Sequence, residues 1–488
     1  MPAYVCGLKI CLLGDDFLKL NLAKFFGAQD MTKGNPYTNL IQFAAPLLVG
    51  NLMQQLYGTV DSIIVGKYVG DNALAAVNAT MPIVNLLMVL FMGISVGAGI
   101  MVSQYFGAKD RVMLSKTVGN AMTLTFLSSL IITVLGLVIS RPMLELLGTP
   151  TEIIDWSTSY MLIYFGGFLG CACYNMISGI LRGMGDALMP LAFLVLACVL
   201  NIILDIVFVA VLGMGVAGVA WATILAQFIS CIFCIVRLLN MKDTVDVNRQ
   251  TLTLSKEVSM RVIRLGLPSG LTQMIFSLAS VVVQSLTNSF GTMAMTCATI
   301  VMRVDGFVMM PNFSFGAAMT TYAGQNIGAG DIKRVDQGTK AGMKLGVAVS
   351  SVLCVLILIF GRYLMQMFTN TPELINMAMH MMSIIAVGYI AMGVTQILSG
   401  IMRGAGDTVT PMWISIITTV IIRVPTAYVL AFLSRTAEQP AGSPDSLFWS
   451  LLISWVSGAV LTCIFFKVGK WRKKGITAKA IQAEQNEA

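Results

Sequence analysis

Charged residues and histidine are scarce in this sequence. Asp, Glu, Lys and Arg make up 11% of its 488 residues, whereas soluble globular domains carry about 25%, which argues against a water-soluble enzyme. Ten cysteines are too few for a secreted protein built on disulfides. The single histidine, His380, rules out histidine-rich metal sites, and the sequence has no Gly-x4-Gly-Lys-Ser/Thr motif for ATP binding.

Hydrophobic residues are abundant, at 57% of the chain, and the mean hydropathy is +0.82. A helix that crosses a bilayer needs about 20 mainly apolar residues. Twelve stretches meet this need, and they are too long and too little alternating to be strands of a membrane barrel. The sequence therefore predicts an all-α integral membrane protein with twelve transmembrane helices. The stretches cover residues 40–65, 78–104, 117–140, 154–181, 187–211, 216–239, 262–289, 296–325, 341–361, 375–401, 411–433 and 447–467.

Lys and Arg are distributed unevenly between the loops. Fifteen lie in the loops that follow the even-numbered stretches, against four in the opposite loops. Because short cytoplasmic loops carry the excess of positive charge, both termini are expected in the cytoplasm, with residues 469–488 as a basic tail. The net charge of +8 is spread over these loops, so no nucleic-acid partner is expected. Met31 opens a polar lead into the first stretch, and residues 1–34 are expected to be a disordered extension.

A thirteen-residue sequence occurs twice, 221 residues apart. Residues 178–190 and 399–411 share eight of their thirteen positions. Each repeat would hold six spans, so both lobes would have the same orientation, with a substrate site between them. The predicted lobes cover 35–239 and 259–468 and are joined by a polar cytoplasmic linker, 240–258. Two parallel lobes favour an alternating-access carrier over a static pore.

The repeated sequence contains an Arg-Gly-x-Gly-Asp turn. Arg182 and Asp186 are four residues apart across the two glycines, and so are Arg403 and Asp407. This spacing predicts a tight turn at the cytoplasmic surface in which the two charges compensate each other locally. A structural role is favoured over a direct role in transport.

Three acidic residues lie well inside predicted spans, away from the span ends: Asp61, Asp205 and Asp305. Ionisable groups at membrane depth are costly and mark transport or proton pathways by default. Asp61 shares one helical face with Gln54 and Tyr57 and has no basic residue nearby on its helix. This arrangement favours a coupling role over structural pairing.

The other two acidic residues have polar neighbours. Asn201 precedes Asp205 by one helical turn, so the two side chains share a face. Arg303 lies two residues before Asp305, and a gate or a structural ion pair is as plausible there as coupling. The cysteines at 171, 173, 231 and 234 are expected to be apolar filler, because no histidine or carboxylate accompanies them.

Several motifs together resemble the multidrug and toxic compound extrusion (MATE) family. They are the polar first span over 46–66, Gln104-Tyr-Phe-Gly107 after the second span, the two Arg-Gly-x-Gly-Asp turns, and Asn201-Ile-Ile-Leu-Asp205. The resemblance covers residues 35–470 and implies a cation-driven antiporter that exports bulky, often cationic drugs and metabolites through a V-shaped cavity. Such a protein is not an enzyme, and its partners are an amphiphilic substrate and the lipid bilayer.

The resemblance also implies where the coupling cation binds. In the DinF-like branch, H⁺ or Na⁺ acts at an N-lobe cluster, and no organic cofactor is involved. Here the coupling residues would be Asp61, Asp205, Asn201 and Asn175, with Tyr57, Gln54, Tyr160 and Thr223 lining the substrate cavity nearby. NorM-like relatives use a C-lobe acidic pair, but spans seven and ten of this sequence contain no carboxylate. The DinF-like interpretation is therefore favoured, with H⁺ ahead of Na⁺.

Three other functions remain open at this point, and one of them, a passive channel or receptor, would show no uphill transport. A lipid-linked oligosaccharide flippase of the same superfamily should carry clustered Arg or Lys in its cavity, whereas only Arg303 and Arg423 lie well inside predicted spans, away from the span ends. A membrane-embedded lipid-modifying enzyme would need clustered His, Asp or Arg at one membrane face, and the sequence shows no such cluster. The expected setting is the plasma membrane of a bacterium, with the chain a monomer.

Overall fold

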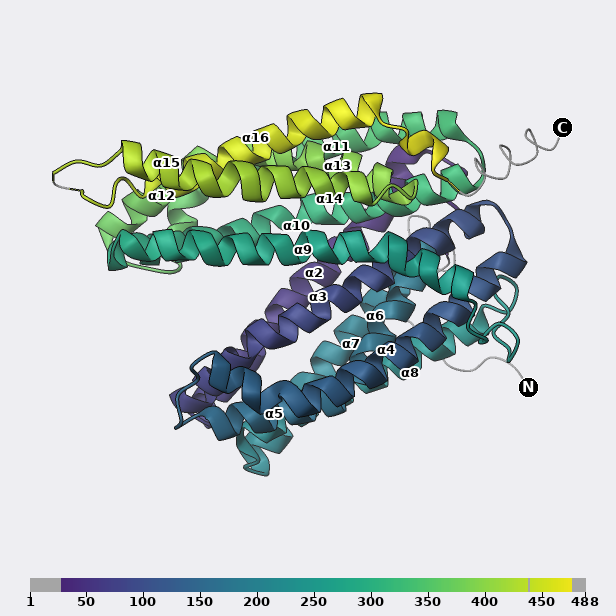
Figure 1. Cartoon of the computed structure of the whole chain (residues 1–488), viewed down its shortest axis with the longest axis horizontal. Coiled ribbons are helices and arrows are strands. Elements are labelled where there is room, and N and C mark those ends of the chain that lie inside the picture. The colour runs from purple at the N-terminus through teal and green to yellow at the C-terminus, as the bar shows by residue number, and fades with distance from the viewer. Residues whose placement is uncertain (1–27, 438, 476–488) are drawn as a thin grey trace, which may run out of the picture.

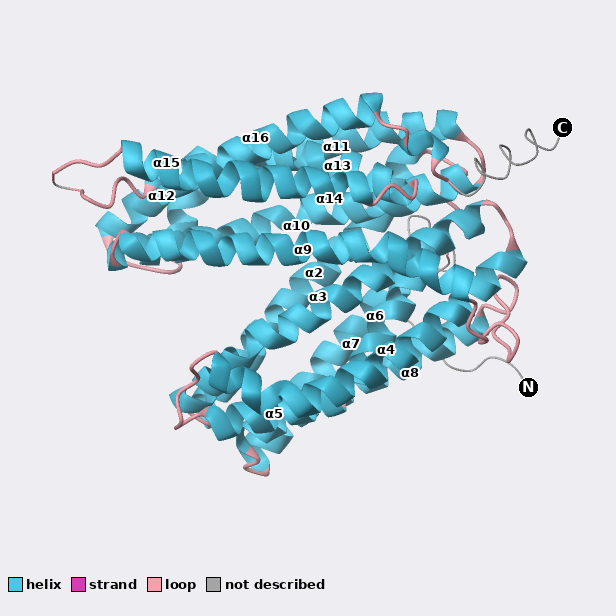
Figure 2. Cartoon of the chain, in the orientation of Figure 1, coloured by secondary structure: helices cyan, strands magenta, loops and turns pink. Residues whose placement is uncertain are grey.

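The computed structural model describes residues 28–437 and 439–475, and helices account for most of them (Figure 2). No strand occurs in these ranges, so the all-α prediction is confirmed. The first lobe consists of α2 (Pro36–Tyr68), α3 (Asp71–Gly107), α4 (Arg111–Leu146), α5 (Ile154–Gly166), α6 (Phe168–Gly183), α7 (Leu188–Asp205), η1 (Ile206–Val211) and α8 (Gly215–Asn240).

The second lobe repeats this order of elements, in agreement with the internal repeat. It consists of α9 (Lys256–Ser289), α10 (Thr292–Gly328), α11 (Ile332–Gln366), α12 (Pro372–Ala386), α13 (Gly388–Gly404), α14 (Val409–Ile416), η2 (Ile417–Arg423), α15 (Val424–Leu433), α16 (Asp445–Val468) and η3 (Trp471–Lys473).

Each of the twelve predicted spans falls on one helix or on one interrupted helix. Within the described ranges, nine helices are long and apolar enough to cross a membrane, and two bent pairs raise the number to eleven. The twelfth span is α2, which has 33 residues but carries Asn51, Gln54 and Asp61 in its middle. These polar side chains reduce its hydropathy, and this is why α2 differs from the other spans.

Both lobes bend their fourth span at a glycine in the same position of the repeat. The angle is 51° between α5 and α6 at Gly167, and 43° between α12 and α13 at Gly388. A Cβ at Gly167 would lie 2.6 Å from the Ile224 side chain, and one at Gly388 would lie 2.6 Å from the Trp455 ring. The small residue therefore lets a neighbouring helix approach the bend closely.

Side-chain caps fix several helix starts. Asn35 accepts a hydrogen bond from the Tyr37 backbone N–H and precedes Pro36, a residue suited to the first helical position. Asp110 caps α4 and Asp331 caps α11 in the same way, at equivalent positions of the two repeats. These polar loop residues thus fix where the following helices begin.

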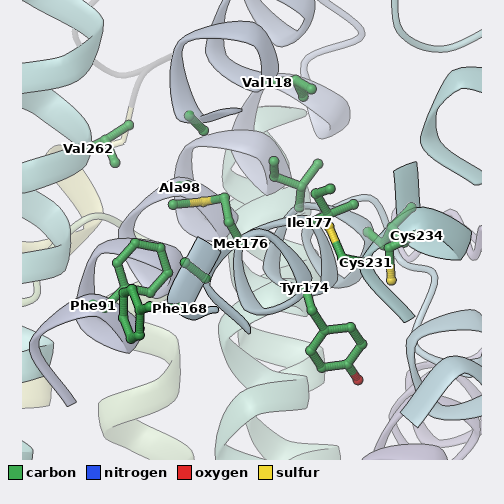
Figure 3. Packing of buried hydrophobic residues seen from close by; sticks show 14 of the residues in the cluster. Phe91, Ala98, Val118, Phe168, Tyr174, Met176, Ile177, Cys231, Cys234 and Val262 are labelled. Atoms are coloured by element: carbon green, nitrogen blue, oxygen red, sulfur yellow. The ribbon is translucent and has the colours of Figure 1, made fainter. Parts of the chain in front are cut away.

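The two lobes meet at the end of the molecule where the described part of the chain begins and finishes, and they diverge toward the opposite end (Figure 1). Each lobe has its own apolar core. In the first lobe, Phe91 and Phe168 pack edge to face with ring centroids 5.9 Å apart, and Cys231 and Cys234 fill space nearby (Figure 3). These two buried cysteines are apolar filler, as predicted.

The first helix of each lobe begins against the other lobe. Leu40 and Phe43 of α2 pack into a cluster with residues of α10 and α13. Val258 and Val262 of α9 pack into the core of the first lobe, where Figure 3 shows Val262. The first half of α2 therefore packs in the second lobe, and the first half of α9 packs in the first lobe. These crossed half-helices contribute to the contact between the lobes at the end where the lobes meet, the closed end of the molecule.

The segments outside the lobes are held against them. Met31 is fully buried, and its backbone N–H donates to Gln325 Oε1 at 2.9 Å, so residues 28–34 do not form the disordered extension expected there. Asn120 of α4 accepts from the Ser255 backbone N–H at 2.7 Å, which fixes the linker. Trp471 of the basic tail is fully buried. Residues 1–27 and 476–488 lie outside the described ranges.

Candidate functional site

Two carboxyl groups from different spans face each other inside the first lobe. Asp61 of α2 is 8% exposed, and Asp205, the last residue of α7, is 0% exposed. The groups are close enough for a hydrogen bond between them once one carries a proton. In the described part of the chain, Oδ1 of each has no hydrogen-bond partner, and neither residue has an ion pair within 4.0 Å. The pair is therefore well placed to take up a proton or another cation.

The amide of Asn201 supports one member of the pair. In the orientation that satisfies its neighbours, its nitrogen donates to Asp205 Oδ2 at 3.1 Å and its oxygen accepts from the Thr223 backbone N–H at 3.3 Å. The Tyr57 hydroxyl donates to Thr223 Oγ1 at 3.2 Å. Asn201 and Thr223 thus connect α7 to α8, and Tyr57 joins α2 to the same network.

The remaining residues predicted for this region lie at different distances from the pair. Tyr160 is buried, stacks on Tyr164 with centroids 6.2 Å apart, and interacts electrostatically with both aspartates. Asn175 donates its amide to the Cys171 carbonyl of its own helix at 2.9 Å. Gln54 is exposed on α2. The structure therefore gathers Tyr57, Tyr160 and Thr223 around the carboxyl pair and leaves Gln54 on the surface of its helix.

A π-helical segment follows directly after Asp205. The segment η1 is six residues long, and such wide turns are rare and occur often at functional sites. In the second lobe, η2 ends at Arg423, a residue buried inside its span. Each lobe therefore interrupts its α-helical hydrogen bonding next to a charged residue at membrane depth.

The Arg-Gly-x-Gly-Asp turns are formed as predicted, but their charges pair differently. The left-handed backbone at Gly185 (φ +90°) and Gly406 (φ +87°) makes the turn. Asp186 pairs with Arg237 at 2.9 Å, and Asp407 pairs with Lys474 at 2.9 Å. The prediction of local pairing within each turn is wrong, because each aspartate caps the following helix and faces a cation from a distant segment.

Removing the cation beside Asp186 should destabilise the first lobe. Asp186 is 1% exposed, and two nitrogens of Arg237 donate to its Oδ2. We expect Arg237→Gln to cost about 2 kcal/mol, because a buried carboxylate loses a charged donor. Thermal unfolding in detergent should show a lower midpoint than in Arg362→Gln, which changes an exposed arginine. Equal midpoints for the two variants would contradict this role.

The arginines of the turns face inward. Arg182 and Arg403 are the half-buried last-turn residues of α6 and α13, and both line a cavity of about 620 Å³ at the inner ends of the two lobes. The sequence placed them in surface loops, away from any cavity. The same cavity is lined by Asp305 and Arg423, so most of its charge belongs to residues that were not predicted to line it.

The ion pair between Arg303 and Asp305, one of the alternatives that the sequence left open, does not form. Arg303 is exposed, whereas Asp305 turns toward Tyr389 and Arg423, with which it interacts electrostatically. Two residues apart on an α-helix, the two side chains point about 200° away from each other. This angle explains why Asp305 reaches the cavity and Arg303 does not.

Two glutamines connect the lobes at the closed end in a reciprocal way. Gln104 of α3 donates to the Gly404 carbonyl of the second lobe at 2.7 Å, and Gln325 of α10 donates to the Gly183 carbonyl of the first lobe at 3.1 Å. A Cβ at Gly107 would overlap the Gln325 carbonyl oxygen. The same holds for Gly328 and Gln104, so backbone touches backbone across this interface.

Comparison with known proteins identifies the family. The MatE family model matches residues 46–207 and 268–429, two segments that begin 222 residues apart and together cover more than half of the chain. The chain belongs to the MATE family. Its members are transporters and not enzymes, and the two matches correspond to the two lobes.

Individual relatives agree with this assignment. The chain is 30% identical to the "Probable multidrug resistance protein YoeA" of Bacillus subtilis over 414 residues, which cover 83% of this chain and 89% of the relative. It is 24% identical to the "Probable multidrug resistance protein NorM" of Thermotoga maritima over 452 residues, 90% of this chain and 94% of the relative. A crystal structure of a MATE protein in the bent conformation superimposes with a TM-score of 0.84 at 23% identity and covers 92% of this chain and 98% of its own.

Proposed function

We propose that the chain is a secondary antiporter that exports amphiphilic drugs or metabolites in exchange for a cation bound at Asp61 and Asp205. The observation that carries this proposal is the pair of facing, buried carboxyl groups without a cationic partner. Two negative charges in this position are unfavourable, so a bound cation relieves the repulsion. Relatives named as multidrug resistance and export proteins support the class of substrate.

The coupling cation that fits best is H⁺, with Na⁺ as the second candidate. In the orientation that satisfies its hydrogen bonds, the Asn201 amide turns its nitrogen toward Asp205. Alkali and alkaline-earth cations bind to oxygen ligands, so Na⁺ would require this amide to turn. A proton shared by Asp61 and Asp205 requires no rearrangement. One charge moving down 100 mV releases about 2.3 kcal/mol, enough to sustain roughly a 50-fold substrate gradient.

Alternating access would work by rocking the two lobes. The closed end is held by the Gln104 and Gln325 contacts and by the crossed half-helices of α2 and α9, and these contacts must separate when that end opens. In this proposal both termini face the cytoplasm of a bacterial cell, and the monomer is the working unit. Cation release and substrate capture would then both occur while the lobes are open to the cytoplasm, and cation binding and substrate release while they are open to the outside.

A lipid-linked oligosaccharide flippase is the second candidate. One observation favours it: Arg182, Arg403 and Arg423 line one cavity, and guanidinium groups suit pyrophosphate. In that case the transported molecule would be a lipid and the substrate would enter from the bilayer.

Transport can be tested in inside-out membrane vesicles that contain the chain. Vesicles energised by respiration should accumulate norfloxacin, which carries a carboxylate and an amine on an aromatic body, and a protonophore should abolish this uptake by collapsing both the pH gradient and the membrane potential. Vesicles that contain Asp61→Asn serve as the control. Energised uptake that is equal in both kinds of vesicle would contradict the proposal.

A further inference from the structure

The central cavity has an unequal balance of charge. Its charged lining, among the residues that the structure describes, consists of three arginines, Arg182, Arg403 and Arg423, and one aspartate, Asp305. Three positive charges and one negative charge leave a net charge of +2. Such an excess of half-buried positive charge needs compensating acceptors when a ligand excludes water from the cavity.

Only one of the arginines faces the aspartate. Arg423 is 8% exposed, interacts electrostatically with Asp305, and has an Nε without a hydrogen-bond partner in the described ranges. Arg182 donates Nε to the Ser178 carbonyl of its own helix. Neither Arg182 nor Arg403 forms an ion pair with any described residue. The excess charge therefore lies on these two guanidinium groups.

The rest of the lining is apolar or neutral. Phe276, Phe313 and Trp455 provide aromatic surface, and Gln273 and Thr418 provide neutral hydrogen-bonding groups. The volume of about 620 Å³ lies within the range of sites for drug-sized molecules. A ligand that fits must therefore present an apolar body and a few polar groups.

We propose that this cavity binds an amphiphile with an oxyanion group, such as a carboxylate, sulfonate or phosphate, on an apolar aromatic or aliphatic body. A ligand that fills the cavity displaces water from Arg182 and Arg403. Buried guanidinium groups then need acceptors, and an oxyanion supplies them in bidentate geometry. This inference rests on the proposed transport function and names its substrate class.

A purely cationic amphiphile fits this cavity poorly. It would remove the same water without supplying an acceptor, and it would add a positive charge next to two others. Asp305 offers little compensation, because Arg423 interacts electrostatically with the same carboxylate and carries the opposite charge. The substrate class is therefore narrower than the often cationic drugs that the family resemblance implies, and it includes molecules that carry both charges.

Two dyes with the same ring system test the preference. Fluorescein is an anion and rhodamine 123 is a cation, and both are xanthenes of similar size. Fluorescence anisotropy with the purified full chain in detergent should show fluorescein binding at least about tenfold more tightly. Arg403→Gln and Arg182→Gln should each weaken fluorescein binding about tenfold, because each removes a charged donor. Neither substitution should weaken the binding of rhodamine 123.

Two further variants guard against misfolding. Arg403→Lys keeps the charge and should retain most of the fluorescein binding. Arg362→Gln removes an exposed arginine outside the cavity and should change nothing. Tighter binding of rhodamine 123 than of fluorescein to the wild-type chain, or fluorescein binding unchanged in Arg403→Gln and Arg182→Gln, would overturn the inference.

A second arm identifies the source of the oxyanion. The fluorescein titration is repeated in nanodiscs of phosphatidylcholine alone and of phosphatidylcholine with phosphatidylglycerol. Competition by phosphatidylglycerol assigns the cavity to an anionic lipid headgroup, as in a flippase, and equal binding in both discs assigns it to a water-soluble amphiphile. Either result supports an oxyanion site.

Failure of this inference can be told apart from failure of the transport proposal. Asp61→Asn removes the proposed coupling group in the first lobe and leaves the cavity arginines in place. It should bind fluorescein as the wild type does while it loses energised transport. If the wild type shows no energised transport but keeps the preference for fluorescein, the antiport proposal fails and the oxyanion site stands.

Discussion

Asp61→Asn should abolish uphill export of norfloxacin from intact cells while the variant folds and reaches the membrane normally. The substitution keeps the size of the side chain and removes its ability to bind a cation. The outward gradient, up to roughly 50-fold when one charge moves down 100 mV, should fall to none. Measuring the ratio of internal to external norfloxacin at steady state gives this result directly.

Asp205→Asn should abolish uphill export in the same way. The double variant should export no less norfloxacin than either single variant, because the effects of residues that act as a unit are not additive. Asp71→Asn is the matched control, since Asp71 is an exposed carboxylate at the start of α3. Export by a well-expressed Asp61→Asn variant at the wild-type level would rule out the carboxyl pair as the coupling site.

Gly107→Ala should shift the protein away from the state in which the lobes meet at the end that holds the Gln104 and Gln325 contacts. The added Cβ would overlap the Gln325 carbonyl oxygen. Because that atom belongs to the backbone of α10, the helix itself must move. We expect the closed end to open and transport to fall at least tenfold, since alternating access requires both states to be populated.

Spin labels at positions 112 and 333 can measure this shift. Val112 on α4 and Lys333 on α11 are exposed and occupy equivalent positions of the two repeats. In Gly107→Ala the distance between the labels should increase relative to the wild type. Gly58→Ala is the matched control, because a Cβ there meets no atom within 4 Å. Distance distributions that are identical in Gly107→Ala and the wild type would show that this contact does not hold the closed state.

The carboxyl pair illustrates what the sequence could predict. Asp61 and Asp205 could be found by asking which acidic residues interrupt apolar spans, because that property is local. Their contact could not be derived in this way, since 144 residues separate them. The MATE resemblance placed both in one cluster, and the structure shows which groups surround them: Asn201 and Thr223 lie beside Asp205, whereas Asn175 hydrogen-bonds to its own helix.

The two Arg-Gly-x-Gly-Asp turns show where local reasoning failed. Spacing along the chain predicted that Arg182 pairs with Asp186. In the structure the partner of Asp186 is Arg237 on α8. The helix that carries Arg182, α6, approaches α3 closely at Gly183. The Arg182 side chain lines the cavity instead. Ion pairs between distant segments depend on how helices pack, and a single sequence holds no direct signal for that. The repeat itself marked the right residues, and the tight turns form as predicted, but the charges pair with other partners.

Uptake into proteoliposomes with the purified chain tests the central claim most directly. A pH gradient and a Na⁺ gradient are imposed separately, and norfloxacin movement is followed by fluorescence for the wild type and for Asp61→Asn. The account predicts that the wild type moves norfloxacin against its gradient. The pH gradient drives this movement if the pair binds H⁺, and the Na⁺ gradient drives it if the pair binds Na⁺. Asp61→Asn should show no uphill movement under either gradient. Equal uphill movement in the two proteins, or only downhill movement in the wild type under both gradients, would contradict it.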